Sequence, residues 1–187
     1  MMQKKDCLIV ALAPLPVLAI PLVGNSVSEE WNWTWHDFVF AWVVLTGTTF
    51  VYRLMATRMD STVIYRLGAG LAVAAGFLIT WLTAAVQIIG DDNPGNILYA
   101  GVILTGLTGV ALARFKPAGM ARAAFATAFA TILVPIIAAV FWPADFSPGM
   151  VPVFLLNGFF ALMFVGSGLL FRRAARKSRG SGATVMA

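Results

Sequence analysis

Hydrophobic residues in this chain gather into six continuous apolar segments separated by short polar stretches. The segments occupy residues 8–24, 38–56, 67–90, 97–115, 123–142 and 151–171. A helix needs about 20 residues to cross the hydrocarbon core of a bilayer, and a helix satisfies its own backbone hydrogen bonds in lipid. The pattern therefore predicts an all-α integral membrane protein, with residues 1–171 forming a single bundle of six transmembrane helices.

The first segment is the least regular. It contains Pro14, Pro16 and Pro21. Proline removes a backbone donor and clashes with the preceding turn, so we expect a kinked helix. Lys4 and Lys5 precede the segment and residues 24–26 offer a cleavage site, so a signal peptide is the alternative. We favour an uncleaved helix because the apolar run is long and rich in proline.

Two polar stretches predict where helices begin. Thr34 and Asp37 have the spacing of a capping box, in which an acid three residues after the N-cap accepts the N-cap N–H. Residues 93–96 read as a turn with proline second and glycine third, followed by Asn96 as the N-cap of the next helix.

Small residues recur every fourth position on three predicted helices. They are Gly68, Ala72, Gly76, Thr80 and Ala84 on the third, Gly101, Thr105, Gly109 and Ala113 on the fourth, and Ala123, Thr127 and Thr131 on the fifth. Such ridges let backbones approach closely in lipid. We predict that these three helices pack tightly together; the alternative is that their smooth faces line a narrow pathway.

The basic residues form four clusters separated each time by two apolar segments. The clusters are Lys4 and Lys5; Arg53, Arg58 and Arg66; Arg114, Lys116 and Arg122; and Arg172, Arg173, Arg176, Lys177 and Arg179. Cytoplasmic loops of membrane proteins keep an excess of Lys and Arg. The distribution predicts that both termini are cytoplasmic, and most acidic residues occupy the alternate loops.

Composition supports this class of protein. Hydrophobic residues make up 60% of the chain, charged residues 11%, and the mean hydropathy is +0.86. These values are typical of membrane proteins. The net charge of +5 reflects the cytoplasmic loops, so the expected partner is the lipid bilayer and no nucleic acid. Cys7 is the single cysteine, which excludes an intrachain disulfide and a cysteine metal cluster.

The C-terminal residues 172–187 differ from the rest of the chain. Five basic residues directly follow the sixth segment, and Gly180, Ser181 and Gly182 come next. We expect glycine and serine to end the helix and predict a basic, disordered cytoplasmic tail. Its cations are expected to contact anionic lipid on the inner leaflet.

Tryptophan is concentrated at the predicted outer surface. The six are Trp31, Trp33, Trp35, Trp42, Trp81 and Trp142. An aromatic belt at the headgroup level accounts for most of them. Trp31, Trp33 and Trp35 alternate along the chain, so an extended segment would present them on one side. The alternative function for that side is contact with a pigment, a quinone or a partner helix.

His36 and the polar residues after the third segment are the other candidate contacts. A single histidine cannot form a two-histidine haem site, and we expect His36 to be a loop residue. The acidic outer rim contains Asp91, Asp92, Asn93 and Asn96, with Asp37 and Asp145 as further candidates, and its oxygens are ligands that hard cations accept. EF-hand spacing is absent, and we predict neither a metal nor a cofactor.

The predicted membrane interior has no Asp, Glu, Lys, Arg or His in its central portion. Proton relays and ion paths depend on such groups, which argues against a pump. Gln87 and Asn157 remain as polar candidates, either bonded to each other or binding a small neutral solute. No catalytic motif occurs, so we assign no catalytic residue.

Four stretches of the chain resemble an uncharacterised family of small bacterial multi-span inner-membrane proteins. They are residues 32–38, 90–96, 113–122 and 156–160, and the likeness covers residues 32–171. The resemblance implies a helical bundle in a bacterial inner membrane, and it implies no activity, substrate or cofactor.

These observations favour a non-enzymatic accessory or scaffold subunit. Small-residue ridges and the outer tryptophans suggest packing against another membrane protein, or into a homo-oligomer. The alternative is a channel or facilitator for a small neutral solute. An enzyme is disfavoured because paired acid–base groups are missing.

Overall fold

The computed structural model describes residues 4–28, 32–57, 62–143, 146 and 149–184, and within these ranges the chain is mostly helical and contains no strand. Side-chain surroundings are described from residue 8 to residue 177 within these ranges. The chain divides into two compact units, Met1–Arg58 and Met59–Ala187. We call them the hairpin unit and the bundle unit. The single bundle expected over residues 1–171 stays a prediction, since each unit is defined by its own contacts.

The hairpin unit contains α1 (Lys4–Leu12), α2 (Leu15–Val27) and α3 (Trp35–Thr57). Pro14 lies at the break between α1 and α2, where the helix would otherwise continue. The kink expected in the first segment is confirmed, because a proline ring cannot fit against the preceding turn. Both α1 and α2 contact α3.

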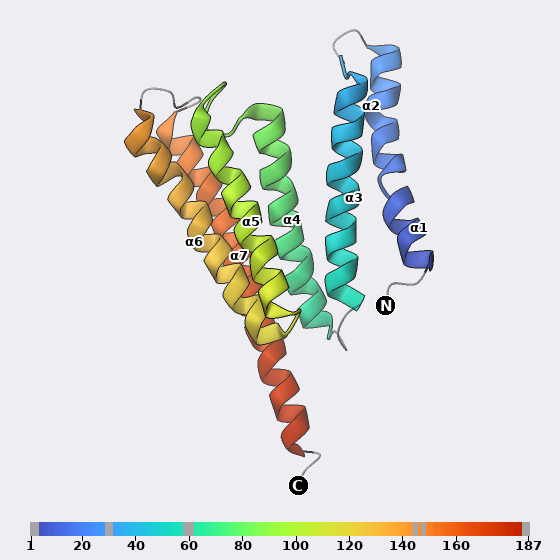
Figure 1. The fold of residues 1–187 in the computed structure, drawn as a ribbon, viewed down its shortest axis with the longest axis vertical. Coiled ribbons are helices and arrows are strands. Elements are labelled where there is room, and N and C mark those ends of the chain that lie inside the picture. Colours follow the sequence, from blue (N-terminus) through green and yellow to red (C-terminus); the bar gives the residue numbers. More distant parts are fainter. Residues whose placement is uncertain (1–3, 29–31, 58–61, 144–145, 147–148, 185–187) are drawn as a thin grey trace. The chain divides into compact units, whose positions relative to one another are not determined.

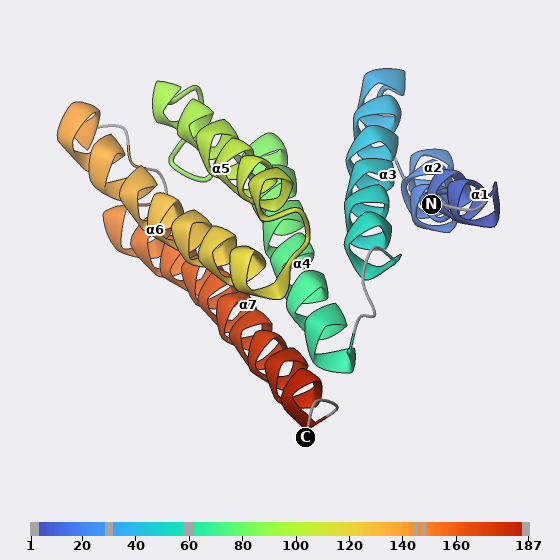
Figure 2. The same ribbon diagram turned by 60° about the horizontal axis from the view of Figure 1, so that its bottom comes forward.

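The bundle unit contains α4 (Val63–Val86), the short 3₁₀ helix η1 (Pro94–Ile97), α5 (Leu98–Ala113), α6 (Pro117–Phe141) and α7 (Met150–Thr184). Consecutive helices run in opposite directions, so the α4–α5 turn lies at one end of the unit and the α5–α6 turn at the other (Figures 1 and 2). The main contacts join α5 to α6, α6 to α7 and α7 to α4.

Six helices of the described chain are long and apolar enough to cross a membrane: Leu8–Val27, Trp35–Thr57, Val63–Val86, Pro94–Ala113, Pro117–Phe141 and Met150–Lys177. This agrees with the predicted all-α architecture of six membrane helices.

The small-residue ridges pack only partly as expected. A Cβ added at Gly109 of α5 would lie 2.6 Å from Cβ of Ala123 on α6, so these two helices meet closely, as predicted. The third helix is different: α4 packs mainly against α7 and only slightly against α5. A Cβ added at Gly68 of α4 would lie 3.2 Å from Cβ of Leu170 and 3.3 Å from the Phe171 ring, both on α7. The prediction that α4, α5 and α6 pack together was therefore wrong for α4.

Glycines on α7 that we did not single out in the sequence explain this choice of neighbour. A Cβ at Gly168 would lie 2.8 Å from the Phe125 ring of α6, and one at Gly166 would lie 3.1 Å from Leu71 of α4. Between them, Ser167 donates a 2.8 Å hydrogen bond to the Gly68 carbonyl oxygen. These contacts place α7 between α4 and α6.

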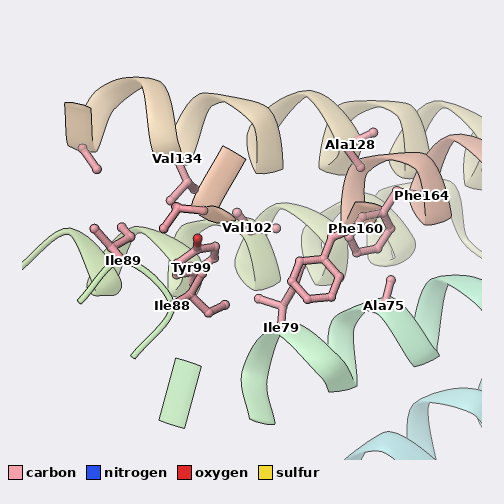
Figure 3. Packing of buried hydrophobic residues seen from close by; sticks show 13 residues of the cluster. Ala75, Ile79, Ile88, Ile89, Tyr99, Val102, Ala128, Val134, Phe160 and Phe164 are labelled. Atoms are coloured by element: carbon pink, nitrogen blue, oxygen red, sulfur yellow. The ribbon is translucent and has the colours of Figure 1, made fainter. Parts of the chain in front are cut away.

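The core of the bundle unit is filled by side chains from all of its long helices. Figure 3 shows Ile79 of α4, Tyr99 of α5, Val134 of α6 and Phe160 of α7 converging in one buried cluster. Ile88 and Ile89, which follow α4, also belong to it. The turn after α4 is therefore anchored in the core.

Two helix ends differ from the sequence prediction. The third helix was expected to reach residue 90, but α4 ends at Val86 because Gln87 adopts a left-handed conformation with φ 47°. The sixth was expected to end at residue 171, but α7 continues to Thr184. Ala174 is buried in this extension, and alanine, arginine and lysine are good helix formers. The expectation that residues 180–182 would not sustain a helix was therefore wrong.

Candidate functional site at the α4–α5 turn

The backbone between α4 and η1 adopts conformations that are uncommon for residues other than glycine. Gln87 has φ 47° and Asp92 has φ 57°, while Gly90 has φ 152°. Side chains that bond to nearby backbone make the left-handed region accessible to Asn and Asp, and glycine enters it without a Cβ clash. The turn therefore needs support from hydrogen bonds.

Amide side chains provide that support. Gln87 Oε1 accepts from the Asp92 N–H, and Asn93 Oδ1 accepts from the Gly95 N–H at 2.7 Å. Asn96 Oδ1 accepts from the Ile89 N–H at 3.1 Å, while its Nδ2 donates to the Gly90 carbonyl oxygen at 2.8 Å. Three amide side chains therefore hold the backbone of the turn through hydrogen bonds.

The predicted turn over residues 93–96 is present, but its cap differs. The Asn96 N–H bonds the Asn93 carbonyl oxygen at 3.0 Å, as a β-turn requires. Asn93 caps η1, and α5 begins only at Leu98. The expectation that Asn96 is an N-cap was wrong, because Asn96 lies within η1, Ile97 occupies the N-cap position of α5, and the Asn96 side chain bonds the backbone of the turn.

An open pocket of about 600 Å³ lies beside this turn. It is lined by Thr83, Ala84, Gln87, Asp92, Asn93, Pro94, Asn96 and Ile97. Thr83 lies in the last turn of α4, and Gln87 is the left-handed residue that ends this helix. The pocket thus combines the end of α4 with the turn that follows it.

Two polar atoms of the lining residues have no hydrogen-bond partner. Asn93 is 5% exposed, and its Nδ2 is buried and unpaired although its Oδ1 is bonded. Thr83 Oγ1 is also buried and unpaired. Thr80, Thr105, Thr127 and Thr131 instead donate to the backbone carbonyl four residues earlier. Leaving a buried polar group unpaired costs about 1–3 kcal/mol of folding stability, so two such atoms among the lining residues are unusual.

The structure gathers part of the predicted acidic rim here. Gln87, Asp92 and Asn93 line the pocket, whereas Asp91 is exposed beside it and is not part of the lining. Asp145 lies outside the described residues. Within the described chain, no group of three or more His, Cys, Asp or Glu side chains is placed to hold a metal ion.

Asn157 is elsewhere, in the core between α5 and α7. Its Nδ2 donates to Tyr99 Oη at 2.8 Å and to the Val153 carbonyl oxygen at 2.9 Å. Tyr99 Oη in turn lies 3.2 Å from Asn157 Oδ1. The expected pairing of Asn157 with Gln87 was therefore wrong: each amide has a nearer partner.

The tryptophan segment before α3 is organised by local helix-start contacts. Asp37 Oδ2 accepts from the Thr34 N–H at 2.7 Å, which confirms the acidic half of the predicted capping box. The Trp33 ring packs edge-on against Phe38 with ring centroids 5.3 Å apart. Residues flanking a helix start in this way form a hydrophobic staple. Asn25 of α2 also bonds both the N–H and the carbonyl oxygen of Trp33.

These contacts separate the candidate residues of the hairpin unit. Trp33 is half-buried by the staple, whereas Trp35 begins α3, is 67% exposed and stacks on the exposed His36 ring at 3.5 Å. Trp31 lies outside the described residues. The expectation that alternate tryptophans share one side of an extended segment does not hold for Trp33 and Trp35, because the helix begins between them.

Thr83 and Tyr99 are polar residues of interest that sequence reasoning missed. The spacing of Thr83 four residues before Gln87 is a signal that was available. Nothing local marks Tyr99, since its partner is 58 positions away in the chain.

No family model, curated protein or solved structure matches the chain.

Proposed function

We propose that this protein is a non-enzymatic integral membrane protein that serves as an accessory or scaffold subunit, packing against another membrane protein or assembly. The proposal places it in a bacterial inner membrane, in line with the resemblance of residues 32–171 to small bacterial membrane proteins.

One observation supports this function most directly: the polar groups in the interior of the bundle unit are used to hold its helices together. Asn157 bonds Tyr99 across α7 and α5, and Ser167 bonds the Gly68 backbone across α7 and α4. No Asp, Glu, Lys, Arg or His is buried among the residues with described side chains. Proton relays and acid–base catalysis depend on such groups.

The exposed apolar surface of the hairpin unit supports the part of the proposal that concerns packing against another membrane protein. In their most apolar stretches, 17% of Leu8–Val27 and 11% of Trp35–Thr57 is buried, the same shares as in Val63–Val86 and Pro94–Ala113 of the bundle unit and less than the 39% of Pro117–Phe141 and Met150–Lys177. Exposed side chains on α3 include Trp35, Val39, Phe40, Trp42, Val43 and Phe50. Lipid supplies no hydrophobic force between helices, so helices associate there through van der Waals packing. The exposed face of α3 offers a surface for such packing against a partner protein.

The proposed orientation has both termini in the cytoplasm. At the end of the bundle unit that holds the α5–α6 turn, the exposed basic side chains are Arg66, Arg114, Lys116, Arg122, Arg172, Arg173, Arg176 and Lys177. The opposite end presents Asp91 and Asp92. The positive-inside bias supports placing the basic end in the cytoplasm.

The alternative, a facilitator for small neutral solutes, gains no support from these contacts. Gln87 lines the open pocket, but Asn157 is fully buried and bonded to Tyr99. The two amides that such a path would use do not share a cavity.

The test combines site-specific crosslinking with purification in mild detergent. A photoreactive residue at Val43, which is 54% exposed on α3, should yield one discrete crosslinked protein, and that protein should co-purify at fixed stoichiometry. The matched control is Leu162, 70% exposed on α7. A monodisperse monomer that crosslinks only to lipid at both sites and accelerates neutral-solute flux in liposomes would overturn the proposal.

A further inference from the structure

Tyr65 of α4 connects two other parts of the bundle unit at the end that holds the α5–α6 turn. Its hydroxyl donates a 2.9 Å hydrogen bond to the Phe115 carbonyl oxygen in that turn. Its ring packs edge-on against the Phe171 ring of α7, with ring centroids 5.0 Å apart. Tyr65 and Phe171 are both fully buried. These contacts hold the α5–α6 turn beside the point where the apolar part of α7 ends.

Phe115 and Phe171 each have two basic residues within two positions of them in the chain. These four residues form what we call the basic cluster: Arg114, Lys116, Arg172 and Arg173. All four side chains are exposed. Consecutive Cα atoms are about 3.8 Å apart, so each pair of cations begins close to the Tyr65 contacts. The positive-inside bias explains why such residues lie on one side of a membrane, whereas the Tyr65 contacts bring two pairs of them together.

Carboxylates do not neutralise the basic cluster. Within the described part of the bundle unit, the acidic residues are Asp91 and Asp92, which lie at the opposite end; Asp60 lies outside the described residues. Four cations gathered in this way repel one another, so an anion bound among them stabilises the folded protein. Ala174 is buried, so the turn of α7 that carries the second pair is packed, and its cations stay close to the α5–α6 turn.

The basic cluster lies where helices that are long and apolar enough to cross a membrane end. One such helix ends directly before Arg114, and the next begins directly after Lys116. On the apolar side of the two pairs, Leu112 is 79% exposed and Leu169 is 48% exposed. Exposed apolar side chains beside cations suit a molecule that joins acyl chains to phosphate, and basic pockets between membrane helices bind such headgroups.

We propose that the basic cluster binds the headgroup of an anionic phospholipid that carries two phosphates. The four cations form two pairs, one on the α5–α6 turn and one on α7. A headgroup with two phosphates places one phosphate against each pair, whereas a single phosphate satisfies one pair at a time. Arginine matches phosphate with two parallel N–H donors. The inference goes beyond the proposed scaffold function and does not depend on it, because the site requires only the bundle unit and a bilayer.

Native mass spectrometry of the full-length protein in detergent tests this site, with diphosphatidylglycerol, phosphatidylglycerol or phosphatidylethanolamine added at equal concentration. Detergent removes the bilayer surface, so a lipid that stays bound reports a specific site. We expect diphosphatidylglycerol to be retained about tenfold over phosphatidylglycerol, because a second phosphate adds charge-assisted hydrogen bonds. Phosphatidylethanolamine should be retained least. Equal retention of all three lipids would overturn the proposal and leave an acidic protein as the partner of this surface.

Two double variants remove one pair of cations each. Arg114→Gln with Lys116→Gln removes the pair on the α5–α6 turn. Arg172→Gln with Arg173→Gln removes the pair on α7. Each double variant should lower diphosphatidylglycerol retention about tenfold, because two cations near the headgroup are lost. The substituted side chains are exposed, so both proteins are expected to fold, and unfolding temperatures in the same detergent check this.

The charge-matched control is Arg176→Gln with Lys177→Gln. It removes the same charge from the same helix, but about 6 Å further along its axis. This variant should keep the preference for diphosphatidylglycerol over phosphatidylglycerol. Equal losses from all three double variants would show that retention follows net charge alone, and would overturn the proposal.

Competition with inorganic pyrophosphate separates a lipid from a soluble anion of the same chemistry. Diphosphatidylglycerol should remain bound when pyrophosphate is present in large excess, because its acyl chains add contacts that the soluble anion lacks. Displacement at equal concentration would assign the basic cluster to a soluble ligand and overturn the lipid assignment.

Discussion

Asn157 and Tyr99 are fully buried side chains whose polar atoms meet in the apolar core of the bundle unit. Asn157 also bonds the Val153 carbonyl oxygen at 2.9 Å within α7. Removing one partner leaves the other buried and unpaired, whereas removing both leaves an apolar contact. The pair therefore links α5 to α7 through a buried hydrogen bond.

A double-mutant cycle tests this pair. Tyr99→Phe and Asn157→Leu should each lower the free energy of unfolding in detergent, and the double variant should lose less than the sum. We expect a coupling energy of about 1 kcal/mol, the usual size for hydrogen bonds between membrane helices. Additive losses would show that the two side chains do not stabilise each other.

Between elements, glycines decide how closely helices approach. A Cβ at Gly109 would lie 2.6 Å from Cβ and 3.1 Å from Cα of Ala123, so the backbones of α5 and α6 would have to separate. Gly101, two turns earlier on α5, has nothing within 4 Å of an added Cβ. Both belong to the same small-residue ridge in the sequence, but only Gly109 lies at a helix contact.

Gly109→Ala should therefore destabilise the bundle unit by about 1–3 kcal/mol, the usual cost of overpacking a core. Gly101→Ala is the matched control, and it should be neutral or stabilise α5 by about 0.5–1 kcal/mol, because alanine loses less backbone entropy in a helix. Unfolding of both variants in the same detergent provides the measurement. Equal stability of the two proteins would contradict the close α5–α6 contact.

For the whole molecule, orientation in the membrane follows from charge. Topology can be tested in a Cys7→Ser background with single cysteines at the exposed positions Asp91 and Lys116. An impermeant maleimide should label Asp91→Cys in intact cells and Lys116→Cys only after permeabilisation. The reverse pattern would contradict the proposed N-in and C-in topology.

The basic extension of α7 provides a second test at this scale. Arg172, Arg173, Arg176 and Lys177 are all exposed, and each cation near an anionic surface contributes about 1 kcal/mol. Replacing all of them with Gln should reduce enrichment of phosphatidylglycerol around the protein in mixed-lipid nanodiscs, most clearly at low salt. Deletion of residues 180–187 is the control and should leave the enrichment unchanged; an equal loss would place the lipid contact in the deleted residues.

The sequence by itself determined the helical class, the six segments long and apolar enough to span a membrane, a kink in the proline-rich first segment and the acidic half of the cap at Asp37. These depend on properties of single residues or of neighbours within one helical turn: transfer into lipid, the missing proline N–H, and local hydrogen bonds.

Only the tertiary structure decided that α4 packs on α7, that Asn157 pairs with Tyr99, and that Thr83 and Asn93 line one pocket. All of these membrane helices are apolar, and lipid offers no hydrophobic force that selects one neighbour over another. Which helices become neighbours depends on how well the shapes of their surfaces fit. The glycines of α7, for example, allow α4 and α6 to approach it closely. That information is distributed over residues far apart in the chain, and local patterns do not contain it.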